Sequence, residues 1–167
     1  GFLRQMLRPG DTFIDIGANR GLTTLIAARA VGNEGRVFAF EPSDHDADAL
    51  QENLNRNRIA NVGIFRKAVV DHVGRRPFAL AKDSTRSSFA KNKHPEQVIE
   101  NWFPVETTTY DRFMSRVDVK QVKLLNLDVE GTEGLVLNGG AYAFSSEAAP
   151  MIMVRLNDST LAGMNSN

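Results

Sequence analysis

Residues 13–21, FIDIGANRG, decide the fold of this 167-residue chain. Phe13 to Ile16 has the aromatic and β-branched character of a buried strand. The strand carries Asp15 at its end, and Gly17 and Gly21 then let the backbone turn tightly and approach a ligand that a Cβ atom would obstruct. Ligands of open parallel sheets bind beyond the carboxyl ends of the strands. The stretch therefore predicts a ligand-binding turn at the end of a central strand.

The rest of the chain alternates short apolar runs with helical patterns, as expected when crossover helices join parallel strands. We expect one α/β domain spanning residues 1–167, Rossmann-like, with a mostly parallel sheet and helices on both faces. The expected strands are 13–16, 36–41, 61–65, 68–71, 76–80, 122–128 and 150–156. The expected helices start at 22, 43, 110 and 131, and the last is interrupted near Gly139-Gly140. The polar segment 81–97 is predicted to be an exposed loop and a candidate lid.

Composition narrows the class of partner. Lysine plus arginine equals aspartate plus glutamate at 20 each, so no net field attracts nucleic acid or an anionic membrane. The chain has no cysteine, which excludes disulfide scaffolds, thiolate metal sites and cysteine nucleophiles. No apolar run has the length of a membrane span. We expect a soluble, cytoplasmic protein with a small-molecule partner, no nucleic acid and no membrane; the oligomeric state is open.

The spacing within the turn favours one class of cofactor. A dinucleotide fold needs G-x-G-x-x-G, but here Asn19 takes the middle position and leaves D-x-G-x-x-x-G. An acidic residue in front of the turn suits the cationic, amino-acid-like end of S-adenosylmethionine better than a pyrophosphate. Glu41, at the end of the second strand, can accept hydrogen bonds from both hydroxyls of a ribose. Two alternatives remain open: a tight turn without ligand, and an exposed Glu41 before a helix.

A second pair of acidic residues follows the strand 122–128. Asp128 and Glu130 alternate along an extended chain, so both side chains are expected on one side, next to the first strand. A carboxylate there can accept the proton of an attacking hydroxyl or orient it, so both residues are candidate catalytic groups. The alternative is that one caps the following helix and the other is solvated. Two carboxylates are too few for a metal site, and we predict no metal requirement.

Five motifs in order resemble the FkbM-type family of S-adenosylmethionine-dependent methyltransferases. They are RPGDTFIDIGANRG (8–21), GRVFAFEPS (35–43), KAVVDHVG (67–74), VETTTYDRF (105–113) and LLNLDVEGTEGLVLNGG (124–140). The resemblance implies a class I methyltransferase fold and an acceptor that is a small molecule or sugar. It also implies cofactor contacts from Asp15, Gly17, Asn19 and Gly21, ribose binding by Glu41, and a site edge at Asp128 and Glu130.

Three departures from the family pattern bear on function. Asn126 stands where the family usually has a lysine, and Arg155 stands on the last strand where a glutamate is common. An arginine in place of a carboxylate reverses the local charge. The chain also stops soon after the fifth strand, so we expect the C-terminal strand pair of the complete fold to be missing and its edge strand to be exposed.

The leading hypothesis is an S-adenosylmethionine-dependent O-methyltransferase that uses in-line methyl transfer. A second is a module or fragment that binds S-adenosylmethionine without turnover, which the departures at Asn126 and Arg155 favour. A third is a nicotinamide-dependent oxidoreductase, which only Glu41 and the order of strands and helices favour. The sequence does not identify the acceptor.

Overall fold

A computed structural model describes residues 1–81, 99–129 and 131–155, and five parallel strands form its central sheet. The order is β3-β2-β1-β7-β8. The bounds are β1 (Thr12–Ile16), β2 (Arg36–Phe40), β3 (Val62–Phe65), β7 (Leu124–Leu127) and β8 (Met151–Val154). Strand order reverses between β1 and β7, which places β1 at the point where such sheets bind ligands. The predicted Rossmann-like α/β fold is confirmed.

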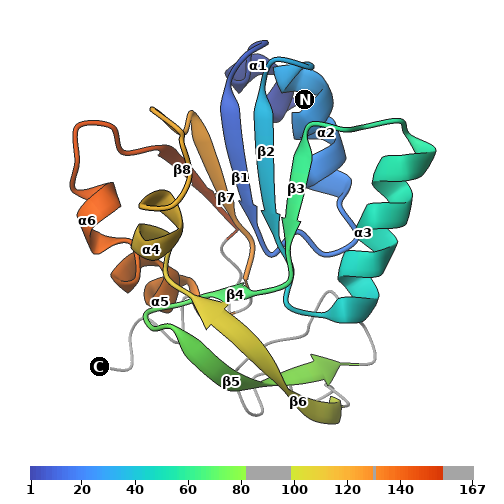
Figure 1. Ribbon diagram of the computed structural model, residues 1–167, viewed down its shortest axis with the longest axis vertical. Helices are drawn as coiled ribbons and strands as arrows, with labels where there is room; N and C mark the ends of the chain where they lie inside the picture. The colour runs from blue at the N-terminus through green and yellow to red at the C-terminus, as the bar shows by residue number, and fades with distance from the viewer. Residues whose placement is uncertain (82–98, 130, 156–167) are drawn as a thin grey trace.

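Helices cover both faces of this sheet (Figure 1). They are α1 (Phe2–Met6), α2 (Leu22–Val31), α3 (Asp44–Arg56), α4 (Tyr110–Met114), α5 (Glu133–Asn138) and α6 (Ala141–Phe144). The predicted break between α5 and α6 is confirmed, and Ser43 caps α3 as expected by accepting from the Asp46 backbone N–H. The sequence reading missed α1, a single short turn whose Leu3 packs against α2 and β1.

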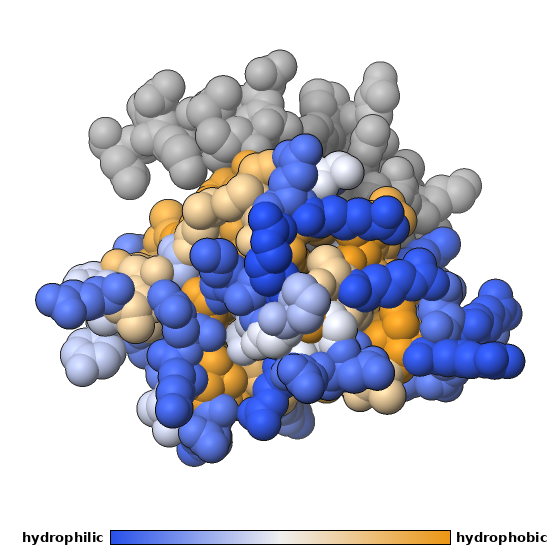
Figure 2. Space-filling view, turned by 90° about the horizontal axis from the view of Figure 1, so that it is seen from above, coloured by the Kyte–Doolittle hydropathy of each residue, from blue (hydrophilic) through white to orange (hydrophobic). Residues whose placement is uncertain are grey.

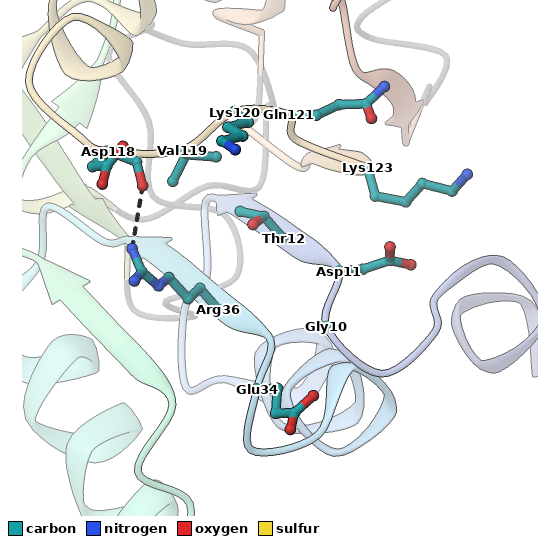
Figure 3. A pocket seen from close by; sticks show the side chains of 10 residues that line it. All are labelled: Gly10, Asp11, Thr12, Glu34, Arg36, Asp118, Val119, Lys120, Gln121 and Lys123. Atoms are coloured by element: carbon teal, nitrogen blue, oxygen red, sulfur yellow. Dashed lines mark hydrogen bonds between the residues drawn. The ribbon is translucent and has the colours of Figure 1, made fainter.

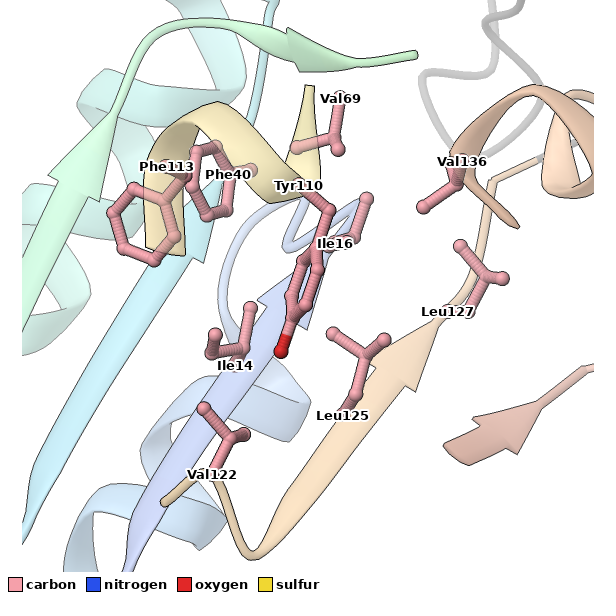
Figure 4. Packing of buried hydrophobic residues seen from close by; sticks show 10 residues of the cluster. All are labelled: Ile14, Ile16, Phe40, Val69, Tyr110, Phe113, Val122, Leu125, Leu127 and Val136. Atoms are coloured by element: carbon pink, nitrogen blue, oxygen red, sulfur yellow. The ribbon is translucent and has the colours of Figure 1, made fainter. Parts of the chain in front are cut away.

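Alternation along β1 divides the core into two layers. Phe13 packs with the helices α1 and α2. Ile14 and Ile16 point to the other face, where they pack with Tyr110 of α4 and Val136 of α5 (Figure 4). The Asp15 side chain points to the same face of the sheet as the Phe13 side chain, so its carboxylate faces α2 rather than α4. This orientation decides which residues can hydrogen-bond to it.

A second, smaller sheet lies across the carboxyl ends of the parallel strands (Figure 1). It has the order β4-β6-β5, with β4 at Ala68–Val69, β5 at Gly74–Ala81 and β6 at Ile99–Thr108. β5 and β6 pair antiparallel, and the strand β6 was not predicted. Trp102, on β6, is 40% exposed. Residues 82–98, which hold most of the candidate lid, lie outside the described residues.

Within the described ranges, no helix has both the length and the apolar character that crossing a membrane would require.

Candidate functional site

The turn after β1 is held to the end of β2 by its own backbone. The N–H groups of Gly17 and Ala18 both donate to the Phe40 carbonyl at 3.0 Å. The Asn19 N–H donates to Glu41 Oε2 at 2.9 Å. The next two N–H groups of the turn donate to Asn19 Oδ1 and to the Ala18 carbonyl. All five N–H groups from residue 17 to residue 21 therefore have partners in the protein.

Glu41 joins this turn to the start of α3. Its Oε1 accepts the Ser43 N–H at 2.9 Å, while its Oε2 takes the bond from Asn19. A carboxylate has about four acceptor sites, so each oxygen can accept a further donor. The side chain is only 6% exposed, and burial raises the pKa of Glu41 to about 7 although the two N–H bonds oppose the shift. Negative charges on Asp46 and Asp15 raise this pKa further.

Asp15 is fully buried and receives two side-chain hydrogen bonds. Thr24, on α2, donates its hydroxyl to Oδ2 at 2.5 Å, and Asn126, on β7, donates Nδ2 to Oδ1 at 2.8 Å. The contact follows from the register, because Asp15 lies directly opposite Asn126. Burial raises the pKa of Asp15, the two bonds lower it, and the charge of Asp128 raises it. Asn126 thus supplies a neutral donor to Asp15 at the position where the family usually has a lysine.

Asp128 lies immediately beyond β7, where its N–H donates to the Ile16 carbonyl at the end of β1. Its Oδ2 is 3.4 Å from Arg155 Nη2, and its side chain is 27% exposed. Burial raises the pKa of Asp128, and the guanidinium of Arg155 lowers it. Glu130, the other candidate catalytic residue, lies outside the described residues. Thr132 holds the N-cap position of the following helix, without a side-chain cap hydrogen bond, so Asp128 is not its N-cap.

Electrostatic interactions connect the acidic groups into one series along the carboxyl edge of the sheet. The negative charge of Asp128 raises the pKa of Asp15, and the negative charges of Asp46 and Asp15 raise the pKa of Glu41. The ion-pair partners found for this series among the described residues lie at its two ends, where Arg155 pairs with Asp128 and Arg20 pairs with Asp46. The middle of the series, Asp15 and Glu41, is buried and receives only neutral donors. Such a site favours a ligand that brings positive charge and hydroxyl donors.

The two glycines of the turn are required by the protein itself. A Cβ at Gly17, where φ is +87°, would overlap the backbone oxygen of Asp128. A Cβ at Gly21, where φ is +90°, would overlap the Leu50 side chain of α3. We interpreted both glycines as room for a ligand, but close packing between elements already accounts for them. Their contact with a cofactor stays a prediction.

A hollow of about 310 Å³ lies at the opposite edge of the sheet (Figure 3). Figure 2 looks onto this edge, where hydrophilic side chains surround apolar patches. Arg36 donates there to the Asp118 carbonyl at 3.2 Å. The ionisable lining residues balance in charge: Asp11, Glu34, Asp118, Arg36, Lys120 and Lys123. Because the hollow lies at the amino ends of the strands, it is separate from the candidate site.

Two contributors to the site were missed by sequence reasoning. Thr24 is a buried hydroxyl on an otherwise apolar helix face, a signal that could have indicated a partner on β1. Asp46 stands in the first turn of α3, where an acidic residue is common for stability alone, but it is 1% exposed and pairs with Arg20 of the turn. Among the described residues, no cluster of three or more His, Cys, Asp and Glu side chains could hold a metal ion.

Comparison with known proteins supports the reading of these motifs. A family model described as "Methyltransferase FkbM domain" matches residues 15–161. The 31-O-demethyl-FK506 methyltransferase FkbM of Streptomyces tacrolimicus is 39% identical over 83 residues, covering 49% of this chain and 31% of that protein. An arsenite methyltransferase of Halobacterium salinarum is 30% identical over 67 residues, covering 40% and 17%. The chain therefore spans less than a third of the length of these two relatives.

Solved structures share the fold. The methyltransferase FkbM from Methylobacillus flagellatus superposes with a TM-score of 0.58 at 16% identity, covering 90% of this chain and 38% of that chain. SMU.1697c from Streptococcus mutans, solved in complex with SAH, superposes with a TM-score of 0.54 at 12% identity, covering 98% and 74%. Since the family model spans most of the sequence, the chain belongs to the FkbM family of methyltransferases, whose cofactor is S-adenosylmethionine.

Proposed function

We propose that this chain binds S-adenosylmethionine across the ends of β1 and β2 and transfers its methyl group to a hydroxyl oxygen of a small molecule or sugar. The acidic series at the carboxyl edge is the observation that carries the proposal. Asp15 and Glu41 are buried without a cationic partner of their own among the described residues, and Glu41 keeps free acceptor sites. These residues fit a ligand that combines a ribose with a cationic amino-acid end.

In this proposal Glu41 accepts the ribose hydroxyls and Asp15 faces the amino-acid end, while Gly17, Asn19 and Gly21 shape the turn between them. When bound, S-adenosylmethionine supplies an electrophilic methyl group, and the bond from methyl carbon to sulfur breaks with its electron pair on sulfur. Asp128 accepts the hydroxyl proton as the acceptor oxygen forms its bond to the methyl carbon. The task of the protein is mainly to hold these atoms in line. Glu130 is proposed to orient the hydroxyl.

Calorimetry with S-adenosylmethionine tests the first step. We expect saturable binding by the wild-type chain and at least tenfold weaker binding by Glu41→Gln, which loses a charged acceptor for the ribose. Glu34→Gln is the matched control, because Glu34 is exposed and lines the hollow at the opposite edge. No binding by the wild type, or equal losses in both variants, would remove the proposal.

One observation favours a second candidate, a module that binds S-adenosylmethionine without turnover. Arg155 pairs with Asp128 and so lowers the basicity of the proposed proton acceptor. A screen of hydroxylated acceptors with isotope-labelled S-adenosylmethionine separates the two candidates, since methyl transfer to any acceptor eliminates the inactive module. The nicotinamide hypothesis is disfavoured, because Asn19 takes the place of the middle glycine of G-x-G-x-x-G and donates its N–H to Glu41.

A small-molecule acceptor, a single domain and a cytoplasmic location stay predictions from the sequence.

A further inference from the structure

Arg155 occupies a place where it can meet the acceptor. Its backbone N–H donates to the Leu127 carbonyl at 3.3 Å, so the residue extends the pairing of β7 and β8 to the carboxyl edge of the sheet. Its side chain is 75% exposed, and its Nη2 lies 3.4 Å from Asp128 Oδ2 in an ion pair. A guanidinium has five N–H donors in a planar fork that matches a carboxylate or phosphate. One long contact leaves most of that fork available.

The pair with Asp128 is also a weak one. A separation of 3.4 Å is long for a charge-assisted hydrogen bond, for which about 2.7–2.9 Å is usual, and the exposed arginine is screened by solvent. An oxyanion that binds both arms of the guanidinium therefore competes well with a single aspartate oxygen. Asp128 would then keep its electrostatic interaction with Asp15 but lose its cationic partner.

We propose that Arg155 recognises an oxyanion, a carboxylate or phosphate, on the acceptor, and that this oxyanion takes the guanidinium from Asp128. The inference rests on the proposed function, since it identifies the class of acceptor for the same site. An acidic acceptor then does two things on binding: it anchors to Arg155, and it frees Asp128 to accept the hydroxyl proton. A neutral acceptor leaves the ion pair in place and is a poorer substrate.

A pH titration followed by NMR tests, without any methyl transfer, whether an oxyanion displaces Asp128 from Arg155. The carboxyl carbon of Asp128 is titrated in sodium acetate, sodium phosphate or sodium chloride at equal ionic strength. Acetate and phosphate are expected to raise its apparent pKa by about one unit, because the opposite charge of the guanidinium is withdrawn, while chloride leaves it unchanged. The two oxyanions also tell whether a carboxylate or a phosphate binds better. An equal response to chloride, or no response to either oxyanion, overturns the proposal.

Three variants sharpen this test. Arg155→Gln is expected to show the raised value without added oxyanion and no further response, whereas Arg155→Lys keeps part of the response. Arg116→Gln is the matched control and is expected to behave as wild type. Arg116 is an exposed arginine that precedes Asp118, a lining residue of the hollow at the opposite edge of the sheet, by two positions. A wild-type response in Arg155→Gln contradicts the proposal.

Matched acceptors supply the second readout. We compare methyl glucoside with methyl glucuronoside and with glucose 6-phosphate. The wild type is expected to methylate one or both acidic acceptors with at least tenfold higher kcat/KM than the neutral sugar, and Arg155→Gln to lose this preference mainly through KM. A preference that persists in Arg155→Gln overturns the assignment. If no acceptor is methylated, the NMR titration still decides the role of Arg155, and calorimetry with S-adenosylmethionine decides the proposed function separately.

Discussion

At the scale of single residues, Glu41 makes the free energy of unfolding depend on pH. The folded protein holds its proton more tightly than the unfolded chain, because burial raises the pKa from 4.5 to about 7. The contribution of Glu41 to the free energy of unfolding is therefore fully present below pH 4.5 and is lost as the pH rises through about 7. The loss is about 3 kcal/mol at most. Urea unfolding at pH 5 and pH 8 should show this decline in wild type and in Glu34→Gln, but a much smaller decline in Glu41→Gln.

The two donors on Asp15 should act as one unit. Removing either donor with Thr24→Val or Asn126→Leu is expected to cost about 1–3 kcal/mol, because a buried carboxylate loses a hydrogen bond. Losing one bond also raises the pKa of Asp15, and a protonated carboxyl depends less on the remaining donor. The double variant should therefore be destabilised by less than the sum of the single changes.

Urea unfolding of the four proteins in this cycle measures the coupling. Thr23→Val is the control, since it makes the same chemical change at the neighbouring position and should have little effect. Strict additivity would mean that the two donors serve Asp15 independently.

At the scale of secondary-structure elements, two glycine substitutions distinguish a glycine that the backbone conformation and packing require from one that only lowers helix propensity. Gly17→Ala places a Cβ against the backbone oxygen of Asp128 at a φ of +87°. It should destabilise the protein by more than about 1 kcal/mol and weaken S-adenosylmethionine binding, because the ends of β1 and β7 must separate. Gly134→Ala meets nothing within 4 Å in α5 and should stabilise by about 0.5–1 kcal/mol. Thermal unfolding and calorimetry measure both effects; equal stabilities would contradict this account.

The parallel sheet could be predicted because each of its strands is a local apolar run followed by a turn or a helix start. Strand β6 could not, since charged and polar residues and Pro104 break the alternation of apolar and polar side chains that would indicate a strand. In the site, Asp15 and Glu41 could be predicted, because Asp15 is the last residue but one of β1 and Glu41 directly follows β2. The pair of Asp128 with Arg155 depends on how β7 and β8 align, and no local pattern encodes that alignment.

At the scale of the whole molecule, a net charge of zero conceals an uneven distribution. The acidic series gathers at the carboxyl edge of the sheet, where Asp15 and Glu41 have only neutral donors. A second hollow at the other edge is lined by Arg4, Arg8 and Arg29 without an acid. Together with the hollow described above, its lining includes more bases than acids: Arg4, Arg8, Arg29, Arg36, Lys120 and Lys123, against Asp11, Glu34 and Asp118. A cationic ligand is therefore attracted to the carboxyl edge, although the protein as a whole is neutral.

This distribution predicts that salt should weaken the binding of S-adenosylmethionine more than that of S-adenosylhomocysteine, which lacks the sulfonium charge but keeps the rest of the skeleton. Raising sodium chloride from 20 to 300 mM shortens the screening length several-fold and should raise the Kd of S-adenosylmethionine by about threefold. The Kd of S-adenosylhomocysteine should change much less, because its charges cancel. Calorimetry at the two salt concentrations measures both ligands on the same protein. Equal salt dependence would mean that the acidic edge does not act on the sulfonium and that the ribose and amino-acid contacts alone select the cofactor.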